Sequence, residues 1–303
     1  MDEQGQSRHN LSCVHYDCHA ASILIRWAGF AAPSHHFRFI MQEKIRARLF
    51  EIEAQEGVKV LYACESGSRA WGFPSVDSDF DVRFLYLHPV EWYLSIEDKR
   101  DVIEHPVQEQ IDLSGWNLRK ALNLFRRSNP PLMEWLGSPI VYLEQSAVSA
   151  QLRKLASTYY SPVACAYHYL HMAQGNFRDY LKGERVWIKK YFYVLRPLLA
   201  VNWIERGWGV APTEFDALAN GLPLDLTLKA EIDKLLEAKR AGAELDYGPR
   251  IAPISDFIES ELSRLEGMTF DYDKHAAPVE QLDALFLSAL KEVWAFRPTQ
   301  IGA

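Results

Sequence analysis

Asp79 and Asp81 form an Asp-x-Asp pair within segment 67–83, and these two residues are the best suited of the chain to metal chemistry. Alternate residues of a strand face the same side of a sheet, about 6–7 Å apart at Cα, so both carboxylates would project together. A third acid, Asp112, lies in the short strand-like run 107–113. Carboxylates arranged in this way predict a site for two Mg²⁺ ions, with Mn²⁺ as an alternative.

A glycine–serine turn precedes the acidic pair. Gly67 lets the backbone approach a phosphate, and Ser68 offers a hydroxyl and an N–H group at an expected helix N-terminus. This combination predicts nucleotidyl transfer, in which a hydroxyl attacks the α-phosphate of a nucleoside triphosphate and pyrophosphate leaves. Asp79 and Asp81 would bind both ions, and Asp112 would hold the ion that activates the hydroxyl.

Two arginines and a tryptophan lie beside these motifs. Arg69 follows the turn directly and is a candidate to clamp a triphosphate, with a surface ion pair as the alternative. Arg83 alternates onto the same face as Asp79 and Asp81, where it would pair with the carboxylates or orient the substrate. Trp71 could stack on a base, but packing in the core is the favoured interpretation.

A polar stripe interrupts an apolar helical pattern over residues 184–204. Lys189, Tyr193 and Arg196 fall at positions i, i+4 and i+7, which places them on one face of a helix. The three acids cover only one side of a triphosphate, so this stripe is the candidate for the other side. The alternative is a solvated face whose long basic side chains cover apolar surface.

The acids and the turn lie where strands alternate with helices. A helical pattern over 41–56 leads into a buried strand, 58–64. A second strand, 80–87, and a helix over 118–127 follow. Strands interrupted by helices therefore predict a compact α/β domain over 41–145.

Helical periods then continue through the second half of the chain, and they predict an all-helical domain over 146–303. The expected helices span 147–158, 161–181, 184–204, 226–240, 251–266 and 278–294. The predicted fold class is therefore α+β. Residues 1–40 fit neither pattern, and we expect them to be a poorly ordered leader. Its Cys/His cluster at 13–19 lacks a second pair at zinc-site spacing, so a loose tail is favoured over a metal site.

Composition bounds the class of protein. The 303 residues are 48% hydrophobic with a net charge of −7, which supports two cored domains and argues against a nucleic-acid coat protein. The four cysteines are scattered, which argues against a disulfide framework. The apolar stretch 20–32 is broken by Arg26 and is too short to cross a bilayer. We expect a cytoplasmic protein with no membrane partner.

The turn, segment 78–81 and Asp112 resemble the active-site signature of the DNA polymerase β nucleotidyltransferase superfamily. Three longer motifs resemble those of one branch of this superfamily, the predicted nucleotidyltransferases that include RNA-ligase-associated polymerase-β-like proteins. These motifs are 67–72 (Gly-Ser-Arg-Ala-Trp-Gly), 111–116 (Ile-Asp-Leu-Ser-Gly-Trp) and 128–131 (Ser-Asn-Pro-Pro). The resemblance covers about 41–265 and implies a divalent-metal-dependent NMP transferase. It also implies that 41–145 is a nucleotidyltransferase catalytic domain, built from a mixed sheet with helices, with a helical domain behind it. It also implies that basic and tyrosyl residues of that second domain reach the triphosphate.

The predicted function is an enzyme that moves an NMP from an NTP, with ATP as the expected donor, to a hydroxyl. An RNA 3′ end, a protein side chain and a small molecule are all open as acceptors. The rival prediction is a nucleotide-sensing or partner-binding module that keeps the fold without turnover, although all three acids are present. A phosphohydrolase is disfavoured because the chain lacks a His-Asp metal signature.

Overall fold

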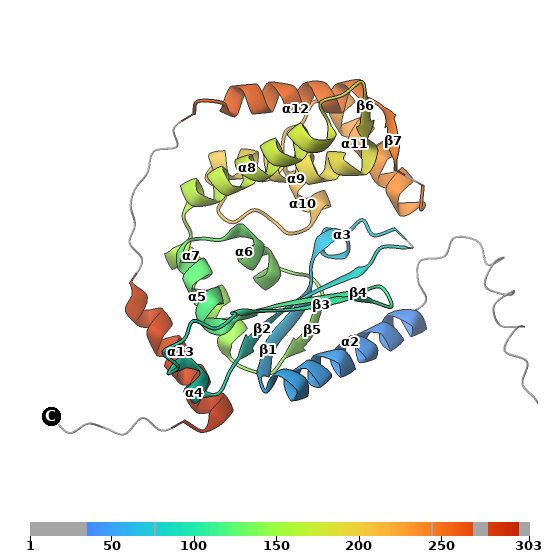
Figure 1. Ribbon diagram of the computed structural model, residues 1–303. Coiled ribbons are helices and arrows are strands. Elements are labelled where there is room, and N and C mark those ends of the chain that lie inside the picture. The colour runs from blue at the N-terminus through green and yellow to red at the C-terminus, as the bar shows by residue number, and fades with distance from the viewer. Residues whose placement is uncertain (1–34, 76, 244, 269–277, 297–303) are drawn as a thin grey trace, which may run out of the picture.

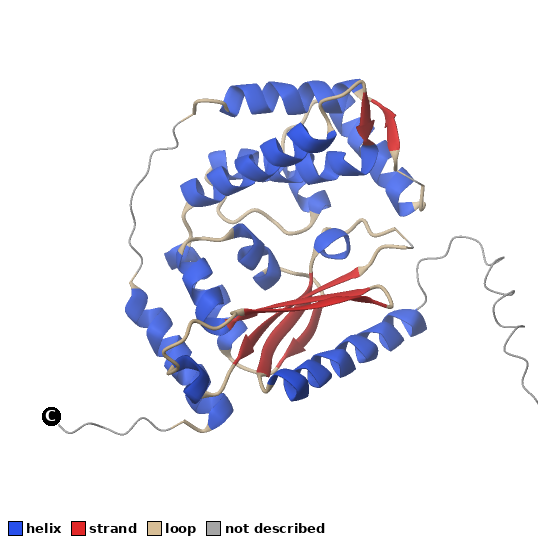
Figure 2. Ribbon diagram, viewed as in Figure 1, coloured by secondary structure: helices blue, strands red, loops and turns tan. Residues whose placement is uncertain are grey.

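The computed structural model describes residues 35–75, 77–243, 245–268 and 278–296. The expected leader up to residue 34 lies outside them, and with it the Cys/His cluster at 13–19. Figures 1 and 2 show the sheet and helix α2 in the lower part of the molecule, and most helices of the second half above them. The α+β fold class is confirmed, because a mixed sheet is followed by a mainly helical region.

Within the described residues, five strands form one mixed sheet in the order β3-β4-β2-β1-β5. Strands β2 and β4 are parallel, and the other neighbours are antiparallel. The strands are β1 (Lys59–Glu65), β2 (Phe80–Leu87), β3 (Val102–Gln108), β4 (Ile111–Asn117) and β5 (Val141–Glu144). The central strands are buried on both faces, which explains why β1 and the end of β2 read as continuous apolar runs.

The run 107–113 is not the single strand that its apolar flanks predict. Glu109 and Gln110 have φ values of 52° and 64°, and they form the tight turn between antiparallel β3 and β4. Left-handed conformations at two successive residues suit a two-residue hairpin, although glycine or asparagine is the usual choice there. The absence of those residues is why the pattern hid the turn.

Helices cover both faces of the sheet. On one face lies α2 (His35–Glu56), which begins before the expected Met41 and buries Ile45, Leu49 and Ile52 against the strands. The short helices α3 (Gly67–Ala70) and α4 (Val90–Tyr93) lie in connections. The other face is covered by α5 (Leu118–Arg126), α6 (Pro130–Leu136), α7 (Val148–Tyr159) and α13 (Val279–Trp294). Sequence placed α7 and α13 in the helical domain, yet both bury apolar residues in the core beside the sheet.

The second half is built around helix α9 (Tyr191–Glu205), most of whose residues are buried. Its helices are α8 (Pro162–Tyr180), α9 (Tyr191–Glu205), α10 (Phe215–Gly221), α11 (Leu226–Arg240) and α12 (Ala252–Leu265). Two short antiparallel strands, β6 (Arg185–Trp187) and β7 (Tyr247–Pro249), were not predicted. A 3₁₀ turn, Ile188–Lys190, follows β6, so the expected helix over 184–204 begins only at Tyr191. The strand pairing with β7 and the burial of Val186 override the helical pattern there.

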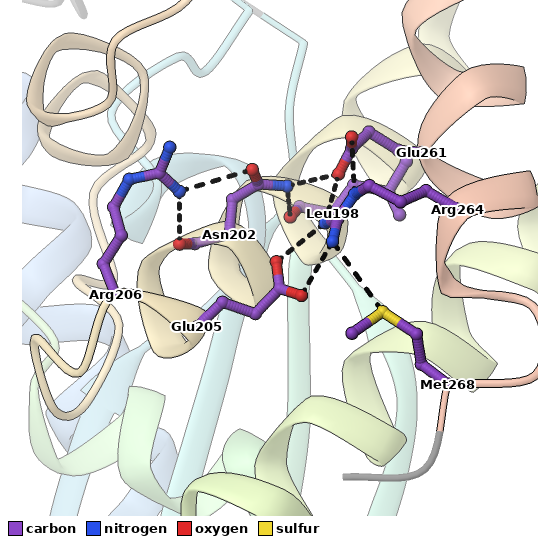
Figure 3. Close-up of polar contacts among 7 residues, drawn as sticks. All are labelled: Leu198, Asn202, Glu205, Arg206, Glu261, Arg264 and Met268. Carbon is purple, nitrogen blue, oxygen red and sulfur yellow. Dashed lines mark hydrogen bonds and ion pairs between the residues drawn. The ribbon is translucent and has the colours of Figure 1, made fainter.

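A polar network joins α9 to α12 (Figure 3). The Arg264 guanidinium donates to Glu205 at 2.7 and 2.9 Å, and to Glu261 at 2.8 and 3.0 Å. Asn202 donates to the second Glu261 oxygen at 2.7 Å. These contacts hold α9 and α12 against each other. Both helices contribute buried residues to the hydrophobic core of the second half.

None of the described helices has the length and apolarity that crossing a bilayer requires. Cys64 and Cys165 are buried free thiols.

Candidate active site

Two of the three predicted acids face one another across neighbouring strands. Asp81 and Asp112 are register partners in the parallel pair β2–β4, so their side chains leave the sheet on the same face. Asp79 lies just before β2 begins and is exposed. Burial raises the pKa of Asp81, and the like charges of Asp112 and Asp79 raise it further. The three carboxylates therefore form a concentrated negative site at one end of β2.

The glycine–serine turn is shaped around Asp81. Gly67 has a φ of +56°, and a β-carbon there would lie 2.1 Å from Asp81 Oδ2. The Ser66 amide also donates to the Asp81 carbonyl at 2.8 Å. A glycine is required at this position both by the left-handed backbone and by the carboxylate that occupies the space of a side chain.

Arg83 lies between the two register partners. Its Nη2 is 2.8 Å from Asp112 Oδ2 and 3.3 Å from Asp81 Oδ1. The predicted same-face position of Arg83 is confirmed, and of the two predicted roles the structure has the pairing with carboxylates. The Arg83 charge opposes the rise in the Asp81 pKa that burial causes.

Glu65, at the end of β1, contacts the backbone of Asp81 and was not predicted as a site residue. Its side chain is fully buried, accepts a hydrogen bond from the Asp81 amide at 2.7 Å, and accepts another from the Tyr142 hydroxyl. Burial raises the pKa of Glu65 to about 7, and the charge of Asp81 adds to this effect. A lone acid after an apolar strand looks like an exposed strand end, so no sequence signal separated Glu65 from surface acids.

A pocket of about 180 Å³ opens beside the acids, between the sheet and the second half. The first half contributes Asp79 and Asp81 together with the hydroxyls of Ser68, Ser75 and Ser78. The second half contributes Lys189 and Tyr193, as the stripe predicted, and also Lys239. Carboxylates of the first half, Asp77 among them, and two lysines of the second half therefore line the same pocket.

Lys239 is the pocket cation that sequence reasoning missed. It lies near the end of α11, is 6% exposed, and its Nζ donates to Ser75 Oγ at 2.8 Å. Burial lowers its pKa, and the neighbouring charge of Lys189 lowers it further. The signal was available, because Lys239 continues the buried stripe of Leu228, Ile232 and Leu235 along α11. A lysine on an apolar helix face needs a polar destination.

The structure places Arg69 and Arg196 away from the pocket lining. Arg69 donates to the carbonyl oxygens of Ser78 at 2.6 Å and Asp79 at 3.0 Å, so it braces the loop that carries the acids. Arg196 is 1% exposed and pairs with Glu134 at 2.6 Å. The Arg196 guanidinium carbon also lies 4.9 Å from the centre of the Trp71 ring. Trp71 packs against the hydrophobic core of the second half, as expected. The predicted stripe therefore splits into two pocket residues, Lys189 and Tyr193, and one buried ion pair at Arg196.

The donor set fits divalent ions chemically. Carboxylates are the ligands that Mg²⁺ prefers, and the repulsion between Asp81 and Asp112 is relieved only in part by Arg83. As arranged, however, the described part of the chain holds no group of three or more His, Cys, Asp or Glu residues gathered closely enough for a metal ion. The Arg83 guanidinium contacts one carboxylate oxygen of Asp81 and one of Asp112.

Two known proteins are similar to this chain over most of its length. The uncharacterized protein YcgL of Bacillus subtilis (strain 168) is 51% identical over 255 residues, spanning 84% of this chain and 98% of that protein. A solved nucleotidyltransferase-like protein from Exiguobacterium sibiricum 255-15 covers 87% of this chain and 97% of its own. At 12% identity and a TM-score of 0.30, that likeness is too distant to support an argument.

A family match spans most of the described structure, including the turn, the three acids and the pocket lysines. Residues 41–288 match the family described as RNA repair pathway DNA polymerase beta (RlaP). The predicted superfamily is therefore confirmed, and the chain belongs to the RNA repair pathway DNA polymerase β family, whose fold is that of a nucleotidyltransferase.

Proposed function

We propose that this protein is a cytoplasmic, Mg²⁺-dependent nucleotidyltransferase. It moves an NMP from an NTP to a hydroxyl and releases pyrophosphate, and ATP is the expected donor. One observation carries the proposal. A single pocket is lined by Asp79 and Asp81 from the first half of the chain and by Lys189 and Lys239 from the second half. A metal-bound triphosphate needs this division, because its ions require carboxylates and its phosphates require cations.

Each residue has a role in this proposal. Asp79, Asp81 and Asp112 would hold the ions, which when bound supply activation of the acceptor hydroxyl and neutralisation of phosphate charge. Lys189 and Lys239 would bind the β- and γ-phosphates and orient the α-phosphate toward the acids. Ser68 would donate a hydrogen bond to the same phosphates, and Gly67 keeps the Asp81 carboxylate next to them.

The acceptor follows from the family description. Because that description names RNA repair, we put an RNA 3′ hydroxyl ahead of a protein side chain or a small molecule. A short RNA end needs only a small contact surface, which is compatible with the net charge of −7.

The experiment is transfer from each labelled NTP, with Mg²⁺, to an RNA oligonucleotide that ends in a 3′ hydroxyl. A 3′-blocked RNA and a protein lysate serve as parallel acceptors. Label on the 3′-hydroxyl RNA alone, lost in Asp81→Asn and kept in the exposed-site control Asp98→Asn, is the expected result. Label on the protein lysate alone would contradict RNA as the acceptor, and no label on any acceptor would contradict the transferase.

A nucleotide sensor without turnover is the second candidate, and the placement of Arg83 favours it. A guanidinium at 2.8 Å from Asp112 already satisfies an acid that a transferase must use. A sensor would bind NTP with an affinity unchanged by Asp112→Asn and would transfer nothing. A transferase would lose turnover in that variant while nearly retaining binding of Mg²⁺-NTP, since Asp79 and Asp81 remain.

A further inference from the structure

Arg83 makes four polar contacts around the two register partners. Its Nη2 contacts Asp112 Oδ2 and Asp81 Oδ1, at 2.8 and 3.3 Å. Its Nη1 donates to the carbonyls of Val82 at 3.2 Å and Asp112 at 3.3 Å. Among the described residues, no other lysine or arginine forms an ion pair with either acid. The Arg83 side chain is 19% exposed, so solvent screens these contacts only in part.

The contacts have an electrostatic consequence. Asp81 and Asp112 stand side by side on hydrogen-bonded strands, where two unscreened carboxylates would repel each other. The guanidinium offsets this repulsion with a single positive charge. A divalent ion placed between the same carboxylates would lie close to the Arg83 guanidinium and would be repelled by its charge. The ion and the guanidinium therefore compete for one place.

We propose that Arg83 is a resident counter-cation of the metal site, which holds Asp81 and Asp112 in register until an arriving metal displaces it. The proposal rests on the metal site of the proposed function. Free divalent ions then bind weakly, because each must expel a cation. A metal arriving with a triphosphate binds better, because the phosphates supply new negative charge for the released guanidinium. Arg83 is thus a positioning residue that favours the metal–nucleotide complex over the bare ion.

The test is Mn²⁺ binding to the purified full chain, followed by electron paramagnetic resonance, with and without a non-hydrolysable NTP analogue. Arg83→Met should bind Mn²⁺ about tenfold more tightly than the wild type when nucleotide is absent, because a neighbouring positive charge is gone. The gain in Mn²⁺ affinity on adding the analogue should shrink by a similar factor. Arg83→Lys keeps the charge but cannot contact both acids in a fork, so its affinity should fall between the two.

Arg100→Met is the matched control. It removes the same charge from an exposed pair with Glu104 and should leave Mn²⁺ binding unchanged. The metal-free Arg83→Met protein should also melt at a lower temperature than the wild type, and saturating Mn²⁺ should close that gap. If Arg83→Met does not fold, Arg83→Lys alone decides the question.

Two outcomes separate this inference from the proposed function. Equal or weaker Mn²⁺ binding by both Arg83 variants, with the wild type binding Mn²⁺ and nucleotide together, overturns the counter-cation and leaves the transferase standing. A wild type that binds no Mn²⁺ even with the analogue overturns the metal site itself, and the inference with it.

Discussion

The Asp81 carboxylate occupies the space into which a side chain on Gly67 would project. A β-carbon at Gly67 would lie 2.1 Å from Asp81 Oδ2 and 2.8 Å from its carboxyl carbon. The turn that was predicted to receive phosphate therefore also sets the position of a predicted metal ligand. Any change in one of these two elements moves the other.

Gly67→Ala should remove activity beyond its effect on stability. The new methyl group must push Asp81 away, and the left-handed φ adds strain of about 1 kcal/mol. Gly57→Ala is the matched control, because Gly57 has a φ of +63° but nothing within 4 Å of an added β-carbon. Both variants should lose similar stability in urea denaturation, and only Gly67→Ala should lose nucleotidyl transfer. Comparable activity losses in the two would show that strain, not Asp81, matters.

Lys239→Met should weaken NTP binding by about 1–3 kcal/mol, the cost of losing a hydrogen bond to a charged group. Methionine fills a similar volume in this buried position, so the fold should persist. Isothermal titration with a non-hydrolysable NTP measures the loss. Lys234→Met, on the exposed side of the same helix, is the control and should bind normally. Unchanged affinity in Lys239→Met would return that lysine to a structural contact with Ser75.

Glu134→Gln should lower the free energy of unfolding by about 3–5 kcal/mol. The change leaves the Arg196 guanidinium buried beside Trp71 without its counter-charge. Asp216→Asn breaks the exposed pair with Arg240 and should cost at most about 1 kcal/mol. Chemical denaturation of the two variants compares them directly. A small effect at Glu134 would mean that water or another group satisfies Arg196.

Stability should fall as the pH drops from 6.5 toward 4, in part because of His88. Burial lowers the pKa of His88 to about 4, and the charge of Lys99 adds to this. The unfolded chain therefore binds a proton over this range that the folded protein does not, so the free energy of unfolding falls as the pH drops. His88→Phe keeps a ring against Trp92, 4.2 Å away between centroids, and should flatten this slope. His36→Phe changes an exposed histidine and should not.

Parts of the site that are local in sequence were predictable. Asp79, Asp81 and the turn lie within one short segment, where strand alternation and glycine chemistry suffice. The position of Asp112 beside Asp81 was also predicted, because an acid flanked by apolar residues on a neighbouring strand is expected to face the same site. Their catalytic and metal roles stay predictions.

Residues that depend on tertiary contacts were harder to predict. Arg196 has the spacing of a substrate ligand, but its partner Glu134 comes from a distant helix, and no local pattern shows that pairing. Glu65 is informative only once Tyr142 and the Asp81 amide surround it. The strands β6 and β7 are separated by more than fifty residues of helical sequence, so their pairing left no local signal.

Because β2 and β4 form a parallel ladder, the site tolerates changes in the length of the connection between the two strands. It does not tolerate insertions within the strands themselves. The separation of Asp81 and Asp112 is set by the hydrogen-bond register of β2 with β4, and the length of the chain between these two strands does not enter it. Insertions in the exposed segment 96–100, between α4 and β3, can therefore lengthen the protein without altering the acids. A single residue added between Ile111 and Asp112 would turn Asp112 to the opposite face of the sheet and dismantle the pair.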